Sequence, residues 1–303
     1  MATDLPPTID PSAARRWAAR PHARTPWLHE EVARRMAERL AVIRLPVRRW
    51  AHWEPARSGL AGHELVAAHY PDAESFRVSA QAGHALSAIE KEATPWWRRW
   101  ARAAQARALV AAPPEGAMQL VWANMLAHQV ADPQALLADW HRVLSPDGFV
   151  MFSCLGPDTL RELRALYAAE GWPPPAQAFT DMHDWGDQLV AAGFAEPVMD
   201  MEHLTLTYDT PARLLAELRE LGRNQHPGRH AALRAPAWRR RLETALDERL
   251  RPPGGGPLRL TFELIYGHAL KAAPRHALAP ETAIPLTAMQ DALRQRHRKP
   301  GAP

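Results

Sequence analysis

The stretch RRWAHWEPARSGLAGHE, residues 48–64, carries the residue types of a cofactor-binding turn in an unusual order. A short run that includes two arginines ends at His52, and Glu54, Pro55 and then Gly59 follow. In a nucleotide-binding fold, glycines after a buried strand let the backbone approach the cofactor. Here an imidazole ends the run and side chains occupy the first loop positions. The stretch therefore predicts the place of a cofactor turn with eroded chemistry.

Two other patterns invite chemical interpretations that we do not favour. The segment DMHDWGD could bind a metal through a group of four residues, Asp181, His183, Asp184 and Asp187. Acids in a first helical turn are more often partners of the helix dipole, so we expect a helix start there. The single cysteine, Cys154, excludes an internal disulfide and any multi-cysteine metal site, and it closes an apolar run. We therefore expect a packing role for Cys154 and no metal site.

The elements that must position these residues alternate between strand and helix. MQLVWAN, a helix opened by Asp132 and Pro133, and FVMFSC form a strand–helix–strand unit of a parallel sheet. Two short apolar runs precede this unit, and two long alternating runs, PVMDMEHLTLTY and LRLTFELIYGHAL, follow it. The predicted fold class is α/β: a seven-stranded, mainly parallel, Rossmann-like sheet with helices on both faces. We expect the last two strands to form an antiparallel hairpin at one edge.

The pattern also predicts how the chain is divided. Residues 1–46 are expected to form a leader, loose over 1–14, and a helical lid with one apolar face. Residues 47–270 are expected to be one α/β domain with helical insertions at about 155–180 and 209–256. The proline-rich and basic segment 271–303 has no periodicity, so we expect disorder.

Composition narrows the class of protein. The net charge of +4 comes almost wholly from arginine, a bias that looks genomic, and it is weak evidence for nucleic-acid binding. PWWRRWARAAQAR interleaves tryptophan and arginine, yet at helical spacing it is typical of an amphipathic helix. No stretch approaches the ~20 apolar residues of a membrane span, and no secretory h-region opens the chain. We expect a cytoplasmic protein without a membrane segment.

Three long blocks in order carry a resemblance to a known family. They are LVWANMLAHQVADPQALLADWHRVLSPDGFVMFSCLGPDTLRELR, FTDMHDWGDQLVAAGFAEPVMDMEHLTLTY and LTFELIYGHA. The chain resembles class I S-adenosylmethionine-dependent methyltransferases, and among them the malonyl-acyl-carrier-protein O-methyltransferases of biotin synthesis. The resemblance implies S-adenosylmethionine as cofactor and an acyl carrier protein or acyl group as partner.

The resemblance also implies where site residues lie and where this chain departs from the family. The family ends its first strand in an acid followed by a GxGxG-type loop, where this chain has His52, Glu54 and a displaced Gly59. Ser79 stands where a second acid holds the ribose hydroxyls. Asn124 is placed beside the cofactor. The substrate side is assigned three residues: His128, Asp158, which could equally cap a helix, and His183.

These departures set the functional expectation. The chain is expected to be a pseudoenzyme-like member of that family, with its cofactor affinity eroded, its activity weak or lost and a binding role retained. S-adenosylmethionine is the expected cofactor if any binds, and no residue is assigned as catalytic. One alternative is an active methyltransferase for a carrier-protein-bound acyl carboxylate, in which Glu54 replaces the displaced acid. A basic nucleic-acid-binding module is the other alternative.

Overall fold

The structure, a computed structural model, describes residues 9–20, 25–79, 106–110, 112–273 and 287, with the backbone alone over 106–110. Contacts divide the chain into a unit spanning Met1–Ala272 and a second one spanning Ala273–Pro303. The first unit contains a seven-stranded sheet. Its strands are β1 (Arg49–Trp53), β2 (Glu74–Val78), β3 (Ala106–Val110), β4 (Met118–Ala123), β5 (Leu144–Leu155), β6 (Ala195–Tyr208) and β7 (Leu258–Leu270).

The strand order is β3-β2-β1-β4-β5-β7-β6, and β7 runs antiparallel to both of its neighbours. The other neighbouring pairs are parallel. This confirms the predicted α/β class, its mainly parallel sheet and its antiparallel last pair. The two strands of that pair are joined by two helices, within the insertion expected at about 209–256.

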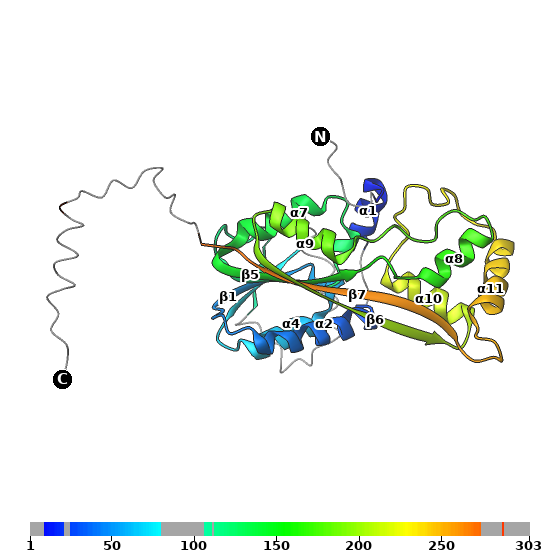
Figure 1. Cartoon of the computed structure of the whole chain (residues 1–303), viewed down its shortest axis with the longest axis horizontal. Helices are drawn as coiled ribbons and strands as arrows, with labels where there is room; N and C mark the ends of the chain where they lie inside the picture. The colour runs from blue at the N-terminus through cyan, green and yellow to red at the C-terminus, as the bar shows by residue number, and fades with distance from the viewer. Residues whose placement is uncertain (1–8, 21–24, 80–105, 111, 274–286, 288–303) are drawn as a thin grey trace. The chain divides into compact units, whose positions relative to one another are not determined.

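Helices cover both faces of the sheet, as the class requires (Figure 1). On one face lie α7 (Pro133–Val143) and α9 (Met182–Ala191), and on the other α2 (Trp27–Arg39) and α4 (Leu60–His69). Beyond the end of β5 lie α8 (Arg161–Ala169), α10 (Pro211–Leu221) and α11 (Pro236–Leu250). Short elements complete the chain: α1 (Pro11–Ala18), η1 (Leu40–Val42), α3 (Pro55–Ser58) and η2 (Ala127–Gln129).

Local signals explain several helix starts. Asp132 accepts a hydrogen bond from Ala135 N, and Pro133 follows it at the first helical position of α7. Asp181 caps α9 by accepting from His183 N, so the acids of DMHDWGD open a helix, as expected. Thr210 does the same for α10 through Arg213 N.

Two boundaries differ from expectation. We expected a loose leader over residues 1–14, but α1 begins at Pro11, because Asp10 accepts hydrogen bonds from Ser12 N and Ala13 N. The helix is held by Trp17, whose Nε1 donates to Gln129 Oε1 at 2.6 Å. We also expected β5 to begin at Phe149, and it begins at Leu144, which pairs with Met118 across an irregular register.

Some expectations fall outside the described residues. These are the amphipathic helix around Trp96 and Trp100, and nearly all of the segment 271–303. The predicted division into leader, domain and tail therefore stays a prediction. Among the described residues, no helix is both long enough and apolar enough to span a bilayer.

Candidate functional site

The carboxyl end of β1 is where the sequence places a cofactor turn. Glu54 follows the strand with φ 52, in the left-handed region that favours glycine. Its amide donates to Val78 O at 2.7 Å, and its carboxylate accepts from Ser79 Oγ at 3.1 Å. The chain therefore keeps the sharp backbone bend of a glycine turn but projects a carboxylate from it.

The last polar residue of β1, His52, lies in a buried group with Ser58 and His63 that we call the β1 cluster. His52 is fully buried, its Nε2 is 2.7 Å from Ser58 Oγ, and its Nδ1 is 3.3 Å from His63 Nδ1. Burial, with smaller contributions from the nearby His63 and Arg77, holds the pKa of His52 well below its usual value. The imidazole is therefore neutral at pH 7, and both of its nitrogens face protein atoms.

The amino end of α4 is capped by a residue from another helix. Glu30 of α2 accepts hydrogen bonds from Leu60 N and Ala61 N, both at 3.0 Å. Gly59 makes this approach possible, since its φ is 113 and a Cβ there would lie 3.0 Å from Glu30 Oε2. Burial raises the pKa of Glu30. The backbone amides that open α4 therefore already hold a carboxylate of the same chain.

Asn124, at the end of β4, joins three segments. Its Nδ2 donates to His29 O at 2.8 Å and also to Ser58 O, and its Oδ1 accepts from Ser153 Oγ at 2.7 Å. The residue is fully buried. Its amide therefore connects α2, α3 and β5.

A cavity of about 110 Å³ lies at the carboxyl end of β5, among η2, α8 and the end of α10. Most of its lining is apolar, and residues from separate parts of the chain contribute to it: Leu155, Leu160, Leu163, Ala176, Phe179, Leu218, Leu221 and Phe262. The polar lining includes His128, Gln177, Arg223 and Gln225. An apolar cavity with a few convergent polar groups is the usual form of a small-molecule site.

Two polar groups of the cavity are unusual. Burial, and to a lesser extent the nearby His29, lowers the pKa of His128 to about 3, so its imidazole is neutral. Its Nδ1 accepts a hydrogen bond from Leu155 N at 3.3 Å. Gln225 Oε1 is buried without a hydrogen-bond partner among the described residues. An unsatisfied buried oxygen is costly, and a donor that reached it would relieve that cost.

Of the three residues assigned to the substrate side, the structure brings only His128 to this cavity. Asp158 lies in the turn after β5, with Oδ2 at 3.1 Å from His203 Nε2. His183 lies on α9, exposed, with Nδ1 at 2.8 Å from Asp181 Oδ1. Substrate roles for Asp158 and His183 therefore have no support from the lining of this cavity and stay predictions.

Comparison with known proteins agrees with this architecture. Residues 78–152 match the family described as Methyltransferase domain. A malonyl-[acyl-carrier protein] O-methyltransferase of Gallionella capsiferriformans is 40% identical over 262 residues, which cover 82% of this chain and 85% of the relative. The enzyme of the same name from Laribacter hongkongensis is 40% identical over 85% of this chain and 87% of its own. The chain belongs to the malonyl-[acyl-carrier protein] O-methyltransferase family.

Solved structures support the fold of this family member. The YcgJ protein from a Bacillus has a TM-score of 0.53 at 13% identity, covering 80% of this chain and 99% of its own. A putative methyltransferase from Bacillus halodurans has a TM-score of 0.51 at 12% identity, covering 80% and 100%. At such low identity the likeness concerns the fold alone.

The described residues do not fit S-adenosylmethionine as the family pattern would hold it. A neutral, doubly engaged imidazole stands at the position of the first acid, and Ser79, which is largely buried, stands at the second. A hydroxyl cannot make the bidentate charged contact of a carboxylate. The opening amides of α4, next to the turn, bind Glu30. We therefore derive no reaction step through this cofactor.

Several residues of the site were not found from the sequence. The cap by Glu30 and the cavity residues Arg223 and Gln225 depend on contacts between distant segments. Helix α1 did have a local signal, because Asp10 followed by Pro11 is a common helix start. That signal would have placed Trp17 in a helix.

Proposed function

We propose that this member of the malonyl-[acyl-carrier protein] O-methyltransferase family retains the acyl-binding half of its site and has lost conventional S-adenosylmethionine binding. Its role is then to bind an acyl group, or the acyl carrier protein that bears one. The relatives' names supply the partner class. The observation that carries the proposal is the β1 cluster, in which a neutral His52 replaces a charged acceptor and bonds to protein.

The expected loss of S-adenosylmethionine affinity supports this interpretation. A hydrogen bond to a charged group contributes about 1.5–3 kcal/mol. Losing two of them, at the positions of His52 and Ser79, amounts to roughly two to four decades in Kd. A micromolar affinity would then fall to the millimolar range or beyond.

Calorimetric titration tests the cofactor half directly. S-adenosylmethionine and its demethylated product are titrated into this protein and, as a positive control, into the Laribacter hongkongensis relative. We expect heat at micromolar concentrations from the relative and, from this chain, no heat below about 100 μM. Micromolar binding by this chain would overturn the proposal.

A pair of variants on one helix tests the acyl half. Leu218 lines the cavity, whereas Leu215, on the same helix α10, packs against the core and does not line it. We expect Leu218→Phe to weaken binding of malonyl-loaded acyl carrier protein, measured by surface-immobilised titration, and Leu215→Phe to leave it unchanged. Equal affinities for both variants would remove the cavity from the proposal.

An active methyltransferase is the second candidate, and one contact favours it. The Glu54 carboxylate accepts from Ser79 Oγ at 3.1 Å, which brings an acid back to the carboxyl ends of β1 and β2. On this alternative, labelled methyl groups pass from S-adenosylmethionine to malonyl-loaded carrier protein, and Glu54→Gln abolishes the transfer. No transfer by the unchanged protein would exclude the alternative.

A further inference from the structure

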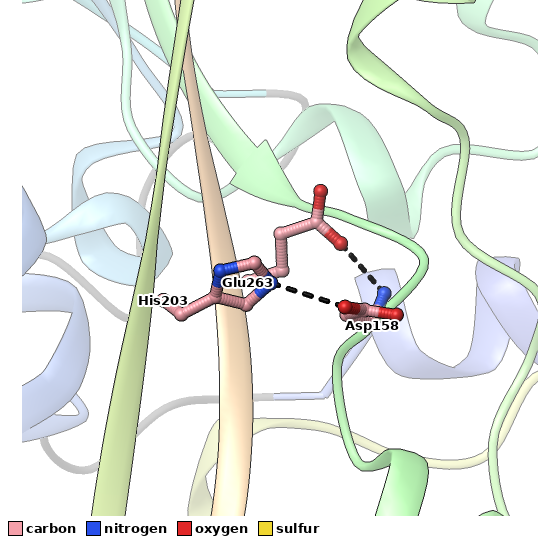
Figure 2. Close-up of side chains that lie close together, drawn as sticks. All are labelled: Asp158, His203 and Glu263. Carbon is pink, nitrogen blue, oxygen red and sulfur yellow. Dashed lines mark hydrogen bonds and ion pairs between the residues drawn. The ribbon is translucent and has the colours of Figure 1, made fainter.

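Three side chains with metal-ligating atoms meet beside β7 (Figure 2). Asp158 comes from the turn after β5, His203 from β6 and Glu263 from β7. One ligand atom of each lies within 4.8 Å of the others. His203 Nε2 is 3.1 Å from Asp158 Oδ2, and Glu263 Oε2 accepts from Asp158 N at 2.6 Å. We call these three residues the β7 cluster.

The backbone holds the β7 cluster in place. His203 and Glu263 are directly paired between β6 and β7, so their side chains share one face of the sheet. The turn that carries Asp158 is bound to β7 through Gly156 N to Glu263 O, 3.0 Å, and Leu160 N to Thr261 O, 2.7 Å. A Cβ at Gly156 would lie 2.5 Å from Glu263 Cδ, so the close approach requires glycine there. The ligand atoms therefore sit on a rigid frame.

The charge of Glu263 is the second observation that points to a ligand. The residue is 3% exposed, and Arg164 interacts with it electrostatically without a direct ion pair among the described residues. Its Oε2 accepts a hydrogen bond from the backbone amide of Asp158. A buried carboxylate without a cation in direct contact gains from one. Asp158 and His203 are partly exposed, so a small cation can reach the cluster from solvent.

We propose that the β7 cluster binds a divalent transition-metal ion of the zinc class. Two carboxylates and one imidazole form a mixed oxygen and nitrogen ligand set that suits such ions. Ligands at about 2.1 Å from one ion lie roughly 3 Å apart, which is the spacing of His203 Nε2 and Asp158 Oδ2. The neutral imidazole would carry its proton on Nδ1, the Glu263 carboxylate would turn inward, and water would complete the coordination.

The metal competes with two arginines and has one structural consequence; the first arginine, Arg164, interacts electrostatically with Asp158 and Glu263. Arg161 Nη1 lies 3.3 Å from Asp158 Oδ2, on a side chain that is 55% exposed and free to turn toward solvent. Thr159 and Leu160, in the same turn as Asp158, line the acyl cavity. A bound ion would therefore fix one wall of that cavity, whether or not the protein transfers methyl groups.

The chain offers a matched control. His183 and Asp181 form another histidine–aspartate contact, at 2.8 Å, but on a single helix turn and with both side chains well exposed. Within the described residues, they belong to no group of three ligating side chains. His183→Gln therefore removes a comparable imidazole without touching the β7 cluster.

The test uses full-length protein dialysed against a chelator and titrated with Zn²⁺ by calorimetry, and with Co²⁺ by visible absorption. We expect one site of unit stoichiometry, weakened roughly 100-fold by His203→Gln and by Asp158→Asn, and unchanged by His183→Gln. Circular dichroism checks that each variant is folded, and we avoid Glu263→Gln because that carboxylate also holds the turn. No ion bound, or binding unchanged by His203→Gln and Asp158→Asn, an adventitious ion only, would overturn the proposal.

Discussion

The β1 cluster and the apolar cavity lie at two parts of the same sheet edge, and they differ in whether their polar atoms already have partners. In the β1 cluster, His52 bonds to Ser58 and His63. In the cavity, Gln225 Oε1 is buried with no partner among the described residues, and the surrounding surface is apolar. A satisfied cluster gains nothing from a ligand, whereas an unsatisfied cavity does.

The N-terminal helices reinforce this difference. Helix α2 places Glu30 on the amides of α4, and it is fixed to the far edge of the sheet by Arg35–Glu202 at 2.7 Å and Arg39–Asp200 at 2.6 Å. Helix α1 instead contacts the wall of the cavity, because Trp17 donates a hydrogen bond to Gln129 and Gln129 lines the cavity. Helix α2 therefore supplies the carboxylate that caps α4, next to the predicted cofactor turn. Helix α1 supports a residue in the wall of the cavity.

Among the predicted changes in stability, loss of the Asn124 side-chain amide should be the largest, because this amide joins three buried segments. Asn124→Ala leaves His29 O, Ser58 O and Ser153 Oγ without this partner in a fully buried place. We expect the free energy of unfolding in urea to fall by about 3 kcal/mol. Asn224→Ala is the control, since its amide makes two bonds nearer the surface, donating to Pro174 O and accepting from His226 N. Equal losses in the two variants would contradict the closed cluster.

Mild acid should destabilise the protein through its buried histidines. The pKa of His128 is lowered to about 3, and the unfolded chain has the ordinary value of about 6.5. Below pH 6.5 the unfolded state binds a proton that the folded state does not, so stability is complete above that pH and falls by about 1.4 kcal/mol per pH unit toward pH 3. His52 adds to this slope in the same direction.

Urea unfolding at several pH values checks this expectation. His128→Gln should flatten the slope between pH 6.5 and pH 4.5 by about one proton. Measurements of both proteins at pH 8, where neither state binds the proton, give the baseline. An unchanged slope would show that the cavity lets His128 protonate in the folded state.

The difference between the two regions also explains what could be predicted from the sequence. Strands such as β4 and β5 are continuous apolar runs, and α7 begins at a local Asp132–Pro133 signal, so they follow from nearby residues. The unusual composition of the turn was visible because Glu54 and His52 stand where the family resemblance implies glycine and an acid. The cap by Glu30 was not visible, because its two partners on α4 are separated from it by 30 and by 31 positions in the chain. The β7 cluster joins residues 45 and 105 positions apart, and no local pattern links them.

Substitutions at two glycines distinguish the cost of backbone strain from the cost of a steric clash with α2. Gly59 has φ 113 and Gly116 has φ 62, but a Cβ at Gly59 would meet Glu30 whereas one at Gly116 would meet nothing within 4 Å. We expect Gly116→Ala to lower the free energy of unfolding by about 1 kcal/mol and Gly59→Ala by about 2 kcal/mol. Thermal or urea unfolding gives both values. If Gly59→Ala lowers the free energy of unfolding no more than Gly116→Ala does, Glu30 can move away from a Cβ at position 59 at little cost. The contact between α2 and α4 would then be weaker than its hydrogen bonds indicate.

The smallest effect concerns the unsatisfied oxygen of the cavity. Gln225→Met removes an acceptor that has no partner, so we expect stability to stay the same or to rise by up to about 1 kcal/mol. Gln177→Met is the matched control, because its amide accepts from Gln225 N at 3.3 Å and donates to His128 O at 3.4 Å, and its loss should lower stability by about 1 kcal/mol. The same Gln225→Met variant should bind malonyl-loaded carrier protein more weakly, since a donor on the ligand loses its acceptor. A variant that is both less stable and equally tight in binding would mean that the oxygen serves the fold and not a ligand, and the contrast with the β1 cluster would disappear.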